Sequence, residues 1–131
     1  MEMHKIREIV LRDVKTDNDS SSLIAKIDDK GDLVLEGYDI GESPKEFWGD
    51  SDYEYWLFVS KEHKDTVLSL LIKEHTGGLS SFLARFRKKS IPKDYRDTVL
   101  LRLIKERFDS LADFSTWLKK KGIPSEFFNW V

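Results

Sequence analysis

The feature that most constrains the fold of this chain is a repeat in its second half. Residues 61–92 align without a gap to residues 93–124, and 15 of the 32 positions are identical. Unrelated segments of ordinary composition would share about 2 positions. The match sets DTVLSLLIKE over DTVLLRLIKE and extends through the turns to an Ile-Pro pair in each copy. Internal duplication explains this better than convergence of two amphipathic helices.

Each copy has the pattern of two helices joined by a turn. Apolar residues recur at helical spacing in the first part of each copy, as in Val67, Leu68 and Leu71. Ser110 followed by Asp113 is typical of the start of a second helix. The repeat therefore predicts two duplicated helical hairpins, with four helices in all. Because two copies are too few for a free-standing solenoid, the remaining chain must cover them.

The first half of the chain, residues 1–60, has the pattern of a small antiparallel sheet of three or four strands. Residues 5–14 favour a strand and the polar run 15–22 favours a loop. Residues 28–31 read Asp-Asp-Lys-Gly and predict a hairpin turn between two further strands. Residues 53–59 read YEYWLFV, are rich in aromatic side chains and predict a last strand.

Two shorter segments complete the predicted architecture. Ser43 followed by Pro44 favours one helical turn over residues 43–49. Residues 125–131 read SEFFNWV, and we expect them to form a short aromatic cap over the last exposed edge of the core. The prediction is a single α+β domain over residues 1–131, with the N-terminal sheet packed against the C-terminal helices.

Two segments of the first half carry a resemblance to a known group of proteins. LVLEGYDIG at 33–41 fits the pattern L-x-x-E-G-x-D-x-G, and DYEYW at 52–56 fits an E-Y-E-Y-like strand that leads into a helix. The chain resembles small bacterial proteins that share this turn and strand and have no assigned function. Tyr38 stands where the pattern often has Gln or His. The resemblance implies a bacterial origin and an α+β fold, and it implies no activity.

The composition of the chain excludes several kinds of site. The 131 residues suffice for one domain, and they contain no cysteine. Disulfides, thiolate metal sites and a cysteine nucleophile are thereby excluded, and a reducing compartment is favoured. No apolar run reaches the 18 residues expected of a membrane span. We expect a cytoplasmic protein without membrane association.

Motifs for catalysis are absent from the sequence. It has no nucleophile elbow, dinucleotide fingerprint or phosphate-binding loop. His63 and His75 would lie about 18 Å apart on one helix, too far to share a metal ion. We therefore expect a protein that is not an enzyme and that has no cofactor and no metal site.

Charge is divided unevenly along the chain. Residues 1–60 hold 7 Lys and Arg against 15 Asp and Glu, whereas residues 61–131 hold 15 against 9. Either the two halves dock on each other with complementary fields, or one face serves an oppositely charged partner. An acidic segment with two large aromatic side chains, residues 39–54, is the candidate for such a face. The residues predicted to bind a partner are Asp39, Glu42, Phe47, Trp48, Asp50 and Asp52.

The leading hypothesis is a non-enzymatic bacterial protein-binding module, similar in size and charge to immunity proteins and inhibitors. Two alternatives belong to other classes. Basic clusters at the helix ends, such as Lys119 to Lys121, would suit a nucleic-acid-associated protein, which the acidic first half makes unlikely. The acidic segment would suit a metal-dependent enzyme, although its spacing matches no calcium loop. Either a monomer or a homodimer is compatible with the sequence.

Overall fold

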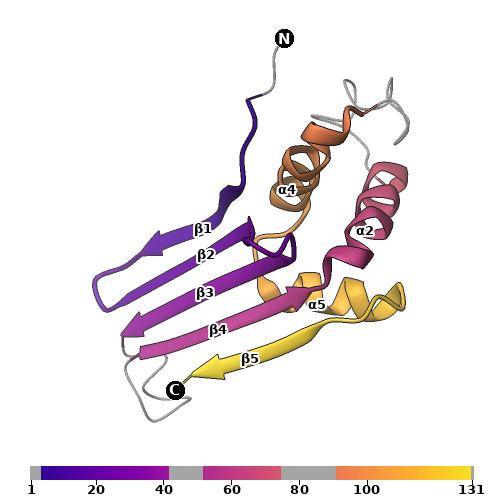
Figure 1. The fold of residues 1–131 in the computed structure, drawn as a ribbon. Coiled ribbons are helices and arrows are strands. Elements are labelled where there is room, and N and C mark those ends of the chain that lie inside the picture. Colours follow the sequence, from indigo (N-terminus) through magenta and orange to yellow (C-terminus); the bar gives the residue numbers. More distant parts are fainter. Residues whose placement is uncertain (1–3, 42–51, 75–90, 131) are drawn as a thin grey trace.

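A computed structural model of the chain describes residues 4–41, 52–74 and 91–130 (Figure 1). The elements are β1 (Glu8–Lys15), β2 (Asp19–Ile27), β3 (Leu33–Gly41), β4 (Asp52–Val59), α2 (Lys61–Glu74), the 3₁₀ helix η2 (Lys93–Tyr95), α4 (Arg96–Arg107), α5 (Leu111–Lys120) and β5 (Glu126–Trp130). The five strands form one antiparallel sheet in the order β1-β2-β3-β4-β5. The predicted α+β class is confirmed at this level.

The helices pack on only one face of the sheet. Along β2, β3 and β4 the large apolar side chains fall on alternate residues, so they share one face. These buried strand residues are Leu23, Ala25, Ile27, Leu33, Leu35, Tyr53, Tyr55, Leu57 and Val59. They form one core with the apolar faces of the three helices. In Figure 1 α5 passes behind the sheet, α2 and α4 lie beyond its upper right end, and the near face carries no described helix.

The two copies of the repeated helix occupy different environments. α2 and α4 pack against each other, and α4 also contacts β1 and β2. Thr98 on α4 is 1% exposed, and its hydroxyl oxygen accepts a hydrogen bond from the Ile6 backbone N–H at 3.0 Å. The equivalent Thr66 on α2 is exposed. Leu101 is buried where the first copy has Ser69. The second copy is therefore the inner helix, and its extra apolar residue follows from that position.

The prediction of a three- or four-stranded sheet against four helices in two hairpins is wrong. The sheet has five strands, and the described part of the chain contains three α-helices. α4 and α5 do not lie side by side, because α5 runs crosswise behind the sheet (Figure 1). The chain turns in extended conformation at Phe108, whose ring packs against Phe114 and Trp117. The second helix predicted for the first copy, residues 79–90, lies outside the described residues.

The fifth strand comes from the segment predicted as an aromatic cap. Glu126–Trp130 pairs with β4, and Phe128 lies directly opposite Trp56. Cross-strand aromatic pairs stabilise the pairing of two strands. No local sequence pattern predicts the pair formed by Trp56 and Phe128. The predicted loop over 15–22 is also too long, since β2 begins at Asp19 and its serines pair with both neighbouring strands.

Other local predictions are confirmed. At the turn between β2 and β3, the Asp28 carboxylate accepts the backbone N–H of Lys30 and of Asp32, each at 2.9 Å. Gly31 has a positive φ of 89° there, which favours glycine. The Ser110 hydroxyl caps α5 by accepting the Asp113 N–H at 3.1 Å. The helical turn predicted over 43–49 lies outside the described residues.

One carboxylate ties the ends of the three helices together. Glu74, at the end of α2, accepts a hydrogen bond from the Trp117 indole at 3.0 Å and pairs with Lys121 at 2.6 Å. Arg107, at the end of α4, donates to the same carboxylate. Hydrogen bonds from Lys121, Trp117 and Arg107 lower the pKa of Glu74 from 4.5 to about 2. The ion pairs therefore stabilise the folded state only where Glu74 is ionised.

Replacing Glu74 with Gln is expected to reduce the free energy of unfolding at pH 7 by about 1–3 kcal/mol. The contribution of the carboxylate is complete above pH 4.5 and is lost as the pH falls toward about 2. The free energies of unfolding of wild type and Glu74→Gln, measured by urea unfolding, should therefore become equal as the pH falls over that range. Glu8→Gln, at an exposed position of β1, is the control. A constant difference from pH 7 to pH 3 would contradict the assignment.

Candidate functional site

The face of the sheet opposite the helices is the most distinctive surface of the described chain, and we refer to it as the open face. Strand register aligns its side chains in rows across four strands. The rows are Ser22–Tyr38–Glu54–Trp130, Ile24–Glu36–Trp56–Phe128 and Lys26–Val34–Phe58–Glu126. Every row contains at least one aromatic ring and one carboxylate. Large rings therefore lie beside acidic groups over the whole width from β3 to β5.

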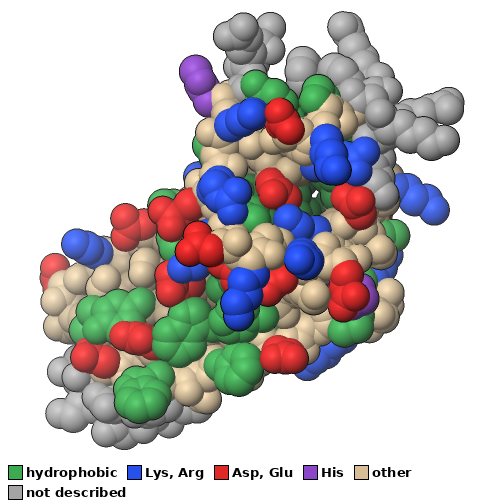
Figure 2. Space-filling model, viewed as in Figure 1, with side chains coloured by type: hydrophobic (Ala, Val, Ile, Leu, Met, Phe, Trp, Pro, Cys, Tyr) green, Lys and Arg blue, Asp and Glu red, His purple; other side chains and the backbone are tan. Residues whose placement is uncertain are grey.

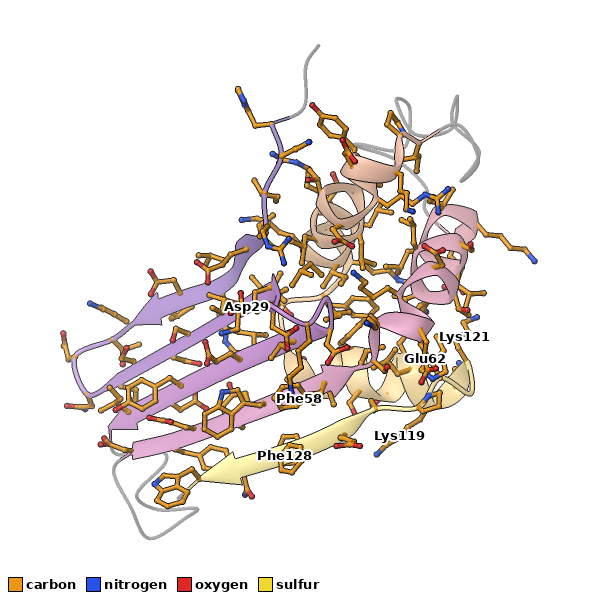
Figure 3. The ribbon with its side chains drawn as sticks, viewed as in Figure 1. Asp29, Phe58, Glu62, Lys119, Lys121 and Phe128 are labelled. Carbon is orange, nitrogen blue, oxygen red and sulfur yellow. The ribbon has the colours of Figure 1, made fainter. Side chains whose placement is uncertain are left out.

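Hydrophobic and acidic side chains gather on this face, as Figure 2 shows. The sequences of β3, β4 and β5 contain five Asp and Glu but no Lys or Arg. Two rings of adjacent strands, Phe58 and Phe128, meet edge to face with centroids 5.6 Å apart (Figure 3). Trp130 is 72% exposed and Phe128 is 52% exposed. Aromatic side chains left in water beside carboxylates are unusual unless a partner covers them.

A hollow of about 270 Å³ lies in the open face between Tyr38 and Trp56. Glu36 and Glu54 supply its acidic groups, and Gly37 lies in its lining. The Trp56 indole donates to the Glu36 carboxylate at 2.9 Å, which fixes that carboxylate against the ring. The hollow thus combines two aromatic side chains with two carboxylates.

The two carboxylates of the hollow differ in their own contacts. Lys26 lies 3.5 Å from Glu36 and partly balances its charge. Glu54 is half-buried, and no hydrogen-bond donor or cation among the described residues contacts its carboxylate. A half-buried carboxylate without a donor loses solvation without compensation, so a bound cation would stabilise it.

Gly37 also links the open face to the core. The Tyr55 ring packs against the other side of Gly37, so a Cβ at this position would lie 2.1 Å from the ring. The Tyr55 hydroxyl lies 3.1 Å from Arg12 and 3.4 Å from Asp39. Burial, and then the Asp39 carboxylate, raise the pKa of Tyr55 to about 12. Tyr55 therefore stays neutral and serves as packing beneath the hollow.

The structure describes two of the six residues predicted to bind a partner. Asp39 lies on the helix-covered side, where the Ser21 hydroxyl donates to it at 2.7 Å and Tyr55 lies close by. Asp52 is exposed and lies on the open face, opposite Ile40. The register therefore points Asp39 and Asp52 to opposite faces of the sheet. Outside the described residues lie Glu42, Phe47, Trp48 and Asp50, for which partner binding stays a prediction.

Sequence reasoning missed the aromatic residues that make the open face. The signal was present, because Tyr38, Trp56 and Phe58 alternate with the buried side chains of their strands. Their alternation identifies a second face but not whether helices cover it. Phe128 and Trp130 gave no signal, since the predicted cap contained no strand.

Other parts of the described surface are weaker candidates for a binding site. A second hollow, of about 580 Å³, lies between the β2–β3 turn, the start of α2 and β5. Two of its four carboxylates already bind backbone N–H groups, since Asp28 holds the turn and Asp32 accepts the Lys61 N–H at 2.8 Å. Among the described residues, no three His, Asp or Glu side chains are placed to hold a metal ion. None of the described helices is long and apolar enough to cross a membrane.

No family model, curated protein or solved structure matches this chain. The geometry and chemistry of the open face are therefore the basis on which a function is assigned below.

Replacing Gly37 with Ala is expected to lower the free energy of unfolding by about 1–3 kcal/mol, because the new methyl group overlaps the Tyr55 ring. The measurement is urea unfolding followed by circular dichroism. Gly122→Ala is the control, since Gly122 has a positive φ of 72° but no atom within 4 Å of an added Cβ. That change should cost about 1 kcal/mol from backbone strain alone. An equal or smaller cost at Gly37 would show that the ring does not pack there.

Proposed function

We propose that this chain is a non-enzymatic bacterial protein-binding module, immunity- or inhibitor-like, whose open face holds a positively charged surface of a partner protein. The observation that carries the proposal is the alternation of exposed rings and carboxylates across β3, β4 and β5, which contain no Lys or Arg. We also propose a cytoplasmic location, which the lack of cysteine favours.

The chemistry of the open face suits arginine and lysine side chains of a partner. A guanidinium stacks over the face of Trp or Tyr and pairs with a carboxylate in the same plane. Both rings line the hollow, and no cation among the described residues contacts the Glu54 carboxylate that lies with them. Exposed Trp and Tyr residues are also the side chains that contribute most to binding at protein interfaces. One cationic side chain in the hollow, with apolar contacts around it, would account for the arrangement.

The predicted acidic segment, residues 39–54, begins on β3 and ends on β4. β3 ends at Gly41 and β4 begins at Asp52, so residues 42–51 join the two central strands of the open face. Asp52 adds a further carboxylate at that end of the face. We therefore propose that the partner-binding surface comprises both the acidic segment and the open face.

The two alternative functions have less support. Carboxylates across the open face would repel the phosphates of a nucleic acid. Of the basic cluster at the end of α5, Lys121 is held by Glu74, which leaves Lys119 and Lys120 exposed. A metal-dependent enzyme would need a ligand group that the described residues do not offer.

A site-specific cross-link tests the proposal. Tyr38→p-benzoylphenylalanine places a photoreactive group at the hollow, and Ala112→p-benzoylphenylalanine places it on the exposed surface of α5. Irradiation in a bacterial lysate should attach one protein with a basic surface at position 38 and not at position 112. Glu54→Lys should lower the yield at position 38 about tenfold or more, because the partner's cation then meets a like charge.

Glu106→Lys makes the same charge change on α4 and should leave the yield at position 38 unchanged. Equal capture at positions 38 and 112 would contradict the proposal. So would a product at position 38 that is nucleic acid, or whose yield does not respond to Glu54→Lys.

A further inference from the structure

The two edges of the sheet are built differently. β1, at one edge, has an irregular register between Val10 and Arg12, and charged residues such as Asp13 and Lys15 lie along it. Lys105 of α4 donates to the Val10 carbonyl at 3.0 Å, so a helix side chain already uses part of this edge. A bulge, charges and a covering side chain are the devices by which proteins prevent pairing at an edge strand.

β5, at the other edge, has one charged residue, Glu126, but no irregularity in its register and no described helix side chain bonded to it. Its sequence EFFNW contains no Lys, Arg or Pro, and its pairing with β4 is regular over all five residues. Its outer side pairs with no strand of the described chain. Phe127 is 50% exposed and Phe128 is 52% exposed, on opposite faces of the strand. A regular, apolar edge strand is a site for pairing with another strand.

We propose that β5 pairs antiparallel with β5 of a second copy of this chain, joining the two sheets into one. The register that pairs all five residues places Phe128 opposite Phe128 of the second copy. It places Glu126, which is the single charged residue of the strand, opposite Trp130. Like charges directly opposite each other destabilise a strand pair, and this register has none. Phe127 lies opposite Asn129 on the helix side.

The difference between the edges also sets the size of the assembly. Pairing of β5 with itself is isologous and uses both β5 edges. The outer edges of the joined sheet are then the two β1 strands, whose bulge and charges oppose further growth. The net charge of −2 offers little repulsion between copies. The product is a closed dimer in which the two open faces become one continuous surface.

This inference is independent of the proposed function, because it concerns the edge of the sheet and not its face. The chain contains no cysteine, so single-cysteine variants report on one contact each. In Phe128→Cys the two thiols lie opposite each other, and mild oxidation should yield a disulfide-linked dimer. In Phe127→Cys the two thiols are offset by two residues, about 7 Å along the strand, and should react at least about tenfold more slowly.

Val14→Cys is the matched control on β1, since Val14 is also 50% exposed. It should give no more dimer than Phe127→Cys. Sedimentation of the wild type should show a monomer–dimer equilibrium that shifts with concentration. Phe127→Lys should shift it to the monomer, because a lysine at the edge opposes pairing.

Three outcomes would overturn the proposal. The wild type could stay monomeric up to a concentration of about 1 mM, which would mean that any dimer has a dissociation constant weaker than that. Val14→Cys could cross-link as fast as Phe128→Cys, which would place the contact elsewhere. The wild type could also form open-ended oligomers, which would exclude the closed pair of β5 strands.

Discussion

The three described α-helices and the alternate apolar side chains of β2, β3 and β4 form one hydrophobic core. Leu23, Leu35 and Leu57 lie in neighbouring strands and are almost completely buried, so helix and sheet supply one core between them. Hydrophobic burial of this kind contributes most of the stability of a small domain. Because every helix is used on this side, the opposite face of the sheet has no helix of the described chain to cover it.

The one-sided core has a chemical consequence for the open face. No described helix packs on the side chains there, and rings and carboxylates alternate along β3 and β4 in place of the mixed charges typical of a solvated sheet. Glu36 is fixed by the Trp56 indole, and Glu54 has no donor among the described residues. Such an arrangement costs solvation in the free protein, and binding of cations offsets that cost.

α2 and α4 have similar sequences but different positions relative to the sheet. α2 and α4 keep the same apolar stripe, so the two helices pack against each other. α4 also packs against β1 and β2, and Thr98 is buried there, whereas Thr66 of α2 is exposed. The ends of the helices are then joined through Glu74. The asymmetry between the copies is therefore a product of packing, and equal sequences do not imply equal environments.

The sequence by itself determined the elements that depend on neighbours along the chain. Helical spacing at 61–74, the turn at 28–31 and the cap at Ser110 rest on contacts within a few residues, so local patterns predict them. Only the tertiary structure decided that Glu126–Trp130 is a strand and which face of the sheet stays open. Those features depend on pairing between segments far apart in the chain, such as Trp56 with Phe128, and on where the helices pack. No local pattern encodes such pairing, because its stabilisation arises only when the distant partner is in place.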